Sequence, residues 1–402
     1  MSNNSHPAVA KPPFFTPGVI IVSIMALIGL TGIGARFLFG LGHVTNLSNQ
    51  FPWGLWIGVD VACGVALAAG GFTSAFIAEI LMKEDFHDIV RPALLTAMLG
   101  YTFVGLGVFV DIGRSYNIWH MLLPSMWSPN SALFEVGMCV ACYITVLYIE
   151  FLPIVLERFK DRVPWPGVNG IIHFLDRIMK KVIWVFIILG VMLSCMHQSS
   201  LGALNVIAAT KIHPLWWTPI LPMLFLLSAF CVGLGMVIFE SGISMRSFKI
   251  PYHYESPTLA KYAKILPFLL TVYFAAKLVD MLNRETWVYL VDGSFEGKMF
   301  MLEVTIGIIL PFCIFISERL RNSFGWLWLA GAMVVAGVVL NRVNVFIIGV
   351  SSPYQDMTGR YSPTGWEWCV TIGCICILTL LARLIILNFP VIHALEGGHD
   401  HE

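Results

Sequence analysis

The sequence predicts an all-α polytopic membrane protein with about ten transmembrane helices. Apolar residues make up 57% of the 402-residue chain and charged residues only 12%, whereas charged residues make up about a quarter of a soluble domain. The mean hydropathy is +0.80. Ten apolar runs reach the roughly 20 residues that a helix needs to cross the hydrocarbon core. The net charge of zero gives no reason to expect a nucleic-acid partner.

These runs lack the two-residue alternation of strands, and helices satisfy their own backbone groups in lipid. The predicted spans cover residues 17–39, 53–81, 91–112, 131–156, 181–209, 216–240, 262–283, 298–317, 324–349 and 365–388. All connecting loops are short, and the longest are 157–180 and 241–261. We therefore expect one integral membrane domain over residues 17–388 and no soluble domain. A soluble substrate or redox centre would then require a partner protein.

The distribution of lysine and arginine predicts the orientation. If the N-terminus lies inside, about two-thirds of the 24 Lys and Arg residues fall on the inner side, as the positive-inside rule requires. Tryptophans crowd the outer ends of the spans, as in an interfacial belt. We therefore expect a multi-pass membrane protein in which residues 1–16 and 389–402 form cytoplasmic tails.

The cysteines and histidines give little support for a metal or haem site. All nine cysteines fall inside apolar runs, including the Cys139-x-x-Cys142 pair, and buried structural roles are usual for such cysteines. A b-type haem in a helix bundle usually takes two histidine ligands, but only His197 lies well inside a predicted span. We therefore predict no metal, haem or iron–sulfur cluster in this chain.

Polar residues within spans are costly and are treated as functional candidates, and here they gather in the outer half. The main candidates are Asp60, Asp111, Arg114, Glu135, His197, Gln198 and Ser200. Further charges at similar depth are Arg36, Lys277, Asp280, Glu303, Arg342 and Glu367. Histidine exchanges protons near neutral pH, and the amide and hydroxyls that follow His197 can bind a polar headgroup. The alternative for this run is a polar contact between helices.

In the inner half, glutamates close the inward-running helices. Glu79 and Glu150 are candidates for a proton path from the cytoplasm, while pairing with inner basic residues is the alternative explanation. Asp60 and Glu79 lie 19 residues apart on one predicted helix. At about 1.5 Å per residue, this separation is close to the hydrocarbon thickness.

Several long motifs in one order resemble the membrane-subunit family of polysulfide reductase, the NrfD-like family, from about Arg36 to the tenth span. They are FPWGLWIGVD (51–60), RPALLTAMLGY (91–101), VDIGR (110–114), MHQSSLGAL (196–204), HPLWWTPILPMLFLLSAF (213–230) and YSPTGWEW (361–368). The similarity is strong through the sixth span and looser after Gly242. Within the family, the sequence is most similar to the branch that serves periplasmic nickel–iron uptake hydrogenases.

The resemblance implies ten helices, the first eight in two four-helix bundles, and no haem. It also implies a quinone pocket near the outer face, with Asp60, Asp111, Arg114 and His197 as the matching candidates for the pocket or its proton relay. Glu135 is supported mainly by its depth. The implied partners are a periplasmic ferredoxin-like iron–sulfur subunit and a catalytic subunit pair.

Our hypothesis is a quinone-reactive membrane subunit that passes electrons between that iron–sulfur partner and the menaquinone or ubiquinone pool. No catalytic residue is assigned. Proton translocation by way of Glu79 and Glu150 is an additional expectation. Three alternatives stay open: a passive membrane anchor, a secondary transporter and a true cytochrome b.

Overall fold

The computed structural model describes residues 12–77, 87–251, 256–351, 359–392 and 395. Within these residues all regular structure is helical, and ten helices are long and apolar enough to cross a membrane. The prediction of an all-α protein with ten spans is confirmed. The spans are α1 (Pro17–Phe39), α3–α4 (Leu55–Leu67, Ala69–Ala75), α5 (His87–Asp111), α6 (Ala132–Phe159), α7 (Pro166–Val206), α8 (Leu221–Phe248), α9–α10 (Ser256–Tyr262, Leu266–Asn283), α12–η5–α13 (Phe295–Val304, Thr305–Ile309, Leu310–Ile316), α15–η6–α16 (Phe324–Val343, Asn344–Ile348, Gly349–Ser351) and α18 (Gly365–Asn388).

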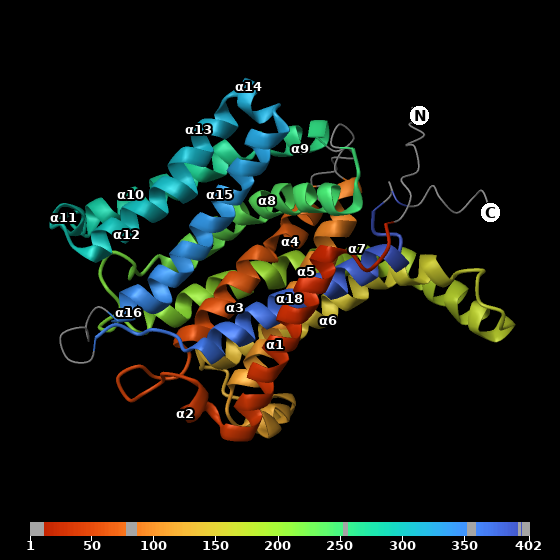
Figure 1. Cartoon of the computed structure of the whole chain (residues 1–402), viewed down its shortest axis with the longest axis horizontal. Helices are drawn as coiled ribbons and strands as arrows, with labels where there is room; N and C mark the ends of the chain where they lie inside the picture. The colour runs from red at the N-terminus through yellow and green to blue at the C-terminus, as the bar shows by residue number, and fades with distance from the viewer. Residues whose placement is uncertain (1–11, 78–86, 252–255, 352–358, 393–394, 396–402) are drawn as a thin grey trace.

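Two four-helix bundles and an outer helix pair build the fold (Figure 1). The first bundle contains α3–α4, α5, α6 and α7, and the second contains α8, α10, α12–α13 and α15. Helix α8 also packs against α4 and α7 and so joins the bundles. The bundles thus use the second to ninth spans, which shifts the expected grouping of the first eight by one helix.

The shift arises because α1 pairs with α18, the last span, instead of entering a bundle. Gly29 of α1 lies against the backbone of Gly373 in α18, with no room for a Cβ at either position. Small residues allow membrane helices to approach closely. The α1–α18 pair then rests on the first bundle through contacts with α5.

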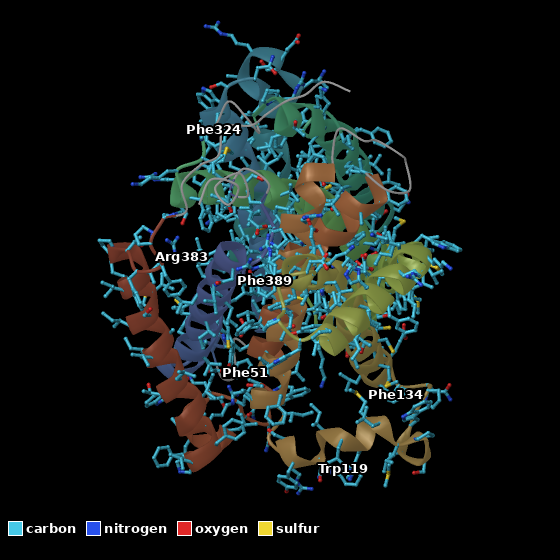
Figure 2. The ribbon with its side chains drawn as sticks, turned by 90° about the vertical axis from the view of Figure 1, so that its right-hand side faces the viewer. Phe51, Trp119, Phe134, Phe324, Arg383 and Phe389 are labelled. Atoms are coloured by element: carbon cyan, nitrogen blue, oxygen red, sulfur yellow. The ribbon has the colours of Figure 1, made fainter. Side chains whose placement is uncertain are left out.

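The helix ends define two faces of the protein. One face carries exposed tryptophans in its loops and at its helix ends, namely Trp53, Trp119, Trp127, Trp287 and Trp366. We call it the tryptophan-rich face; Trp119 marks it in Figure 2. The opposite side, called the terminal face, holds the start of α1 and the end of α18. Arg383 of α18 donates to the carbonyls of Pro13 (2.8 Å) and Phe14 (3.1 Å) there.

Helix α7 is much longer than its predicted span, because it begins at Pro166 instead of near residue 181. Its additional turns are amphipathic, and hydropathy alone therefore missed them. Ile172 and Met179 bury against Leu156 of α6, and Asp176 accepts hydrogen bonds from Lys160 and Lys180. This end of α6 and α7 projects from the bundles at the right of Figure 1.

Candidate functional site

The first polar cluster lies where α1, α3, α5 and α18 meet near the tryptophan-rich face. Arg36 in the last turn of α1 forms an ion pair with Asp111 at the end of α5, and both side chains are buried, with 5% and 9% exposure. The indole of Trp53 donates to the Asp111 carbonyl at 2.8 Å, which fixes the end of α5 against the loop before α3.

Asp60 joins the same cluster from α3. Its carboxylate accepts a hydrogen bond from Thr371 of α18 at 2.6 Å, and Trp56 donates to that threonine at 2.9 Å. Arg36 also interacts electrostatically with Asp60 and Glu367. We call Arg36, Asp60, Asp111 and Glu367 the Arg36 cluster.

The third carboxylate, Glu367, caps its own helix. It accepts from the Thr364 backbone N–H at 2.8 Å and from the Tyr361 hydroxyl at 2.5 Å. The Arg36 cluster therefore places three carboxylates around one guanidinium. One guanidinium carries one positive charge, so the cluster holds more acids than bases.

Arg114, another residue predicted for the site, lies outside this cluster. Its side chain is exposed at the start of the η3 turn (Ser115–Leu122), and Asp111 is paired with Arg36 instead. Arg36 was visible in the sequence as a charge ending the first span. Its pairing was not, because it depends on α1 lying beside α5.

A second cluster occupies the centre of the first bundle, around His197 of α7. The His197 ring is fully buried, and its centroid lies 5.5 Å from that of Tyr101 on α5. Tyr143 of α6 packs edge-on against Tyr101, with centroids 4.4 Å apart. The hydroxyls of Tyr101 and Ser194 lie 3.5 Å apart. We call Tyr101, Tyr143, Ser194, His197 and Gln198 the His197 cluster.

This cluster contains unsatisfied hydrogen-bonding capacity. The Gln198 amide donates to the Val65 carbonyl at 2.8 Å. Among the described residues, neither His197 ring nitrogen nor Gln198 Oε1 has a hydrogen-bond partner, although all three atoms are buried. A buried polar group without a partner costs about 1–3 kcal/mol. The cluster is therefore suited to a water molecule or a polar headgroup.

Carboxylates flank the His197 cluster along α6. Towards the tryptophan-rich face, Ser200 donates to Glu135 at 2.5 Å. Towards the terminal face, Glu150 interacts electrostatically with Tyr143, and its Oε1 atom is buried with no partner in the described part of the chain. At about 1.5 Å per residue, Glu135 and Glu150 are roughly 22 Å apart along the helix. Glu79, the other inner candidate, lies outside the described residues.

Most of the predicted site residues that the structure describes thus lie in or beside two separate clusters, and Arg114 lies apart from both. Asp60 faces α18 through Thr371, while Gln198 contacts α3 at Val65, on a different side of that helix. Within the residues described here, no three His, Cys, Asp or Glu side chains are placed to hold a metal ion.

The second bundle holds a polar network that the sequence hypothesis did not include. Glu303 of α12 forms an ion pair with Lys277 of α10, and both are buried. A cavity lies next to this ion pair. Its polar and aromatic lining includes Trp216, Thr218, Tyr273, Lys277, Asp280, Arg284, Phe300 and Asn341, and six further apolar residues among those described also line it. None of the described residues predicted for the site lines this cavity. The charges were visible within the spans, but their convergence was not.

Comparison of the sequence with known proteins identifies the family. The profile of the family described as polysulphide reductase, NrfD, matches residues 43–352, which is most of the chain. The chain belongs to the NrfD family. It is therefore a multi-pass integral membrane protein of this family, and the resemblance inferred from the motifs is confirmed.

Three relatives cover most of the chain. A protein of Nitratidesulfovibrio vulgaris (strain Hildenborough) is 35% identical over 94% of this chain and 95% of its own length. The probable Ni/Fe-hydrogenase 2 b-type cytochrome subunit of Escherichia coli K12 is 29% identical, covering 100% of this chain and 98% of the relative. The menaquinone reductase integral membrane subunit of N. vulgaris is 27% identical over 88% and 86%. Two of these NrfD relatives are thus named as subunits of larger complexes.

Proposed function

We propose that this NrfD protein is the quinone-reactive membrane subunit of a respiratory oxidoreductase. The observation that carries the proposal is the set of three buried, unsatisfied atoms on His197 and Gln198 in the first bundle. One relative is named a menaquinone reductase subunit, which supports menaquinone or ubiquinone as the ligand. When bound, the quinone supplies two-electron, two-proton redox chemistry.

The residues of the first bundle would bind the headgroup and handle its protons. A neutral His197 presents one donor and one acceptor nitrogen, and Gln198 Oε1 can only accept. Together they match the carbonyl or hydroxyl oxygens of a quinone headgroup. Asp60, oriented by Thr371, and Asp111, paired with Arg36, provide acids nearer the tryptophan-rich face.

Proton supply from the terminal face is the second part of the proposal. The interior of the first bundle contains a series of polar side chains, namely Glu150, Tyr143, Ser194 and His197. Glu150 lies nearest the terminal face. A proton taken up at Glu150 and used at the quinone would make turnover electrogenic. Tyr101 and Tyr143 provide hydroxyls between the two groups.

The electron partner is proposed to dock on the tryptophan-rich face. The Escherichia coli relative is named a hydrogenase subunit, which supports a periplasmic ferredoxin-like iron–sulfur subunit and a catalytic subunit pair as partners. With both termini in the cytoplasm of a bacterial inner membrane, the tryptophan-rich face would be periplasmic. The Arg36 cluster would then lie beneath the docked partner.

The proposal is tested by turnover of the purified complex with a soluble quinol and an artificial electron acceptor. His197→Gln and Asp60→Asn should each lower turnover at least about tenfold, while the complex stays assembled. His173→Gln is the matched control, since His173 lies on the same helix and contacts Asp161 away from the site. Unchanged turnover in a variant that carries both His197→Gln and Asp60→Asn would instead support a passive anchor. Solute transport without redox dependence would support a transporter.

A further inference from the structure

The buried network of the second bundle is centred on Glu303. Its carboxylate accepts from Asn341 and Asn344, each at 2.8 Å, and from the Trp216 indole at 3.1 Å, in addition to the ion pair with Lys277. Two π-helical turns border the network, because η5 starts two residues after Glu303 and η6 starts at Asn344. Such turns often occur at functional sites.

The carboxylate does not depend on Lys277 for its hydrogen bonds. Three neutral donors from α15–η6 and the loop before α8 already satisfy it. The Lys277 ammonium can therefore change its protonation state without leaving Glu303 unsatisfied. The same is not true of a simple two-member buried pair, in which loss of one partner leaves an uncompensated charge.

A second cation compensates Glu303 from the other side. Arg342, 1% exposed, donates to Asn341 Oδ1 at 2.7 Å and to Ser228 at 2.8 Å, and its guanidinium stacks on Phe225. Asn341 thereby bridges Arg342 to Glu303. Arginine keeps its proton in proteins, so Arg342 and Glu303 balance each other whether or not Lys277 is charged.

Of the two cations in the network, only Lys277 can give up a proton, since arginine stays protonated in proteins. With Lys277 protonated, the group of Lys277, Glu303 and Arg342 carries one excess positive charge, and with a neutral amine it carries none. Asp280 and Arg284 form a separate pair, 2.8 Å apart. The charged and titratable groups that surround Lys277 in the described residues are Tyr273, Asp280 and Arg284 on α10, Cys231 on α8, Glu303 on α12 and Arg342 on α15.

The cavity provides space for water beside Lys277. It has about 20 Å³ of space for water, which is enough for about one molecule and too little for a quinone ring. Thr218, in the loop before α8, and Arg284, directly after α10, form part of its wall on the side of the tryptophan-rich face. Farther towards the terminal face the bundle interior is apolar, with Leu270, Ile308 and Val334 buried.

We propose that Lys277 is a proton-exchange site that opens to the tryptophan-rich face. The Lys277 ammonium breaks one N–H bond and gives the proton to the cavity water, which carries it to the face as hydronium. The neutral amine stays beside Glu303 and later accepts a proton by the reverse step. The step involves no change of redox state and does not rest on quinone binding in the first bundle.

Cyanate labelling of the intact complex in lipid nanodiscs tests the proposal, because cyanate is small and carbamylates only neutral amines. Labelling is followed by mass spectrometry between about pH 7 and 11.5, so that the range includes the ordinary lysine pKa of about 10.4. Lys298, exposed near the start of α12 on the same face, is the internal control. The Lys277 midpoint should lie at least about one pH unit below that of Lys298. Absence of labelling at Lys277, or a midpoint at or above that of Lys298, would overturn the proposal.

Two variants test whether the network sets this midpoint. Glu303→Gln removes the negative partner and should lower the Lys277 midpoint by about one pH unit, while Arg342→Met removes the competing cation and should raise it by about as much. Opposite shifts support the assignment. Equal midpoints in both variants would show that Lys277 titrates independently of the network and would contradict it. The wild-type comparison with Lys298 stands even where a variant fails to fold.

Discussion

Arg36 at the end of α1 forms a buried ion pair with Asp111 at the end of α5. The pair fastens the outer α1–α18 helices to the first bundle and brings Asp60 and Glu367 to the same guanidinium. The junction between the outer pair and the first bundle is therefore also the place where acids collect near the tryptophan-rich face. The residues that hold the helices together at this junction are therefore also candidates for the proposed proton chemistry.

Breaking this pair from one side should destabilise the protein strongly. Asp111→Asn leaves the Arg36 charge buried with fewer partners, and we expect a loss of about 3–5 kcal/mol in the free energy of unfolding. Arg114→Gln is the control, because Arg114 is exposed and its replacement should change stability by less than about 0.5 kcal/mol. Denaturant titration in detergent measures both, and an Arg114 effect as large as that of Asp111 would contradict the pairing.

The close approach of α1 and α18 gives a second prediction. Gly29→Ala forces a methyl group against the Gly373 backbone, and overpacking of this kind costs about 1–3 kcal/mol. Gly34→Ala on the same helix meets open space and should be neutral. Thermal unfolding of the two variants side by side checks the prediction, and equal effects would argue against the helix pairing.

Glu150 gives a prediction about proton movement. Glu150→Gln should leave electron flow to quinone largely intact while reducing the membrane potential generated in liposomes by more than about half, because the amide cannot carry a proton. Glu318→Gln, an exposed glutamate at the terminal face, is the matched control. An unchanged potential in the Glu150 variant would remove this residue from the proton path.

His213, in the loop before α8, makes stability depend on pH. Burial lowers the pKa of His213 from its ordinary value of 6.5, and the Leu215 N–H donates to its Nδ1 atom at 3.3 Å. The folded protein then binds this proton less tightly than the unfolded chain, so stability falls as pH drops below about 6.5 and levels off below the folded-state pKa. His213→Asn, which cannot titrate, should weaken this dependence between pH 5 and 8; an identical profile would contradict it.

Much of the fold could be predicted from the sequence because a chain that crosses lipid must satisfy its backbone hydrogen bonds within helices or closed barrels. Ten spans follow from hydropathy, and the spans of α1, α15–η6 and α18 begin and end within about one residue of their predicted limits. The length of helix α7 was underestimated because its first turns are amphipathic. Their packing against α6 does not raise the mean hydropathy of a sequence window. The grouping into bundles depends on glycine contacts between α1 and α18, which lie more than 300 residues apart.

The candidate site was predictable residue by residue but not as a geometry. Depth along each helix identified Asp60, Asp111 and His197, but rotation about the helix axis decides which neighbours they meet. Asp60 turns to Thr371 and His197 to Tyr101. Lys277 and Glu303 had the same depth signal, and nothing in the sequence indicated that they pair with each other or that Trp216 donates to Glu303.

We propose that quinone binds in the first bundle, between the His197 and Arg36 clusters. The most direct measurement is cross-linking of the intact complex with a photoreactive azidoquinone, followed by peptide mapping. We expect cross-links on α3, α5 and α7 near Asp60, Asp111 and His197, and we expect excess quinone or the His197→Gln substitution to suppress them. Cross-links confined to α8, α10 and α15 around the second-bundle cavity would contradict it.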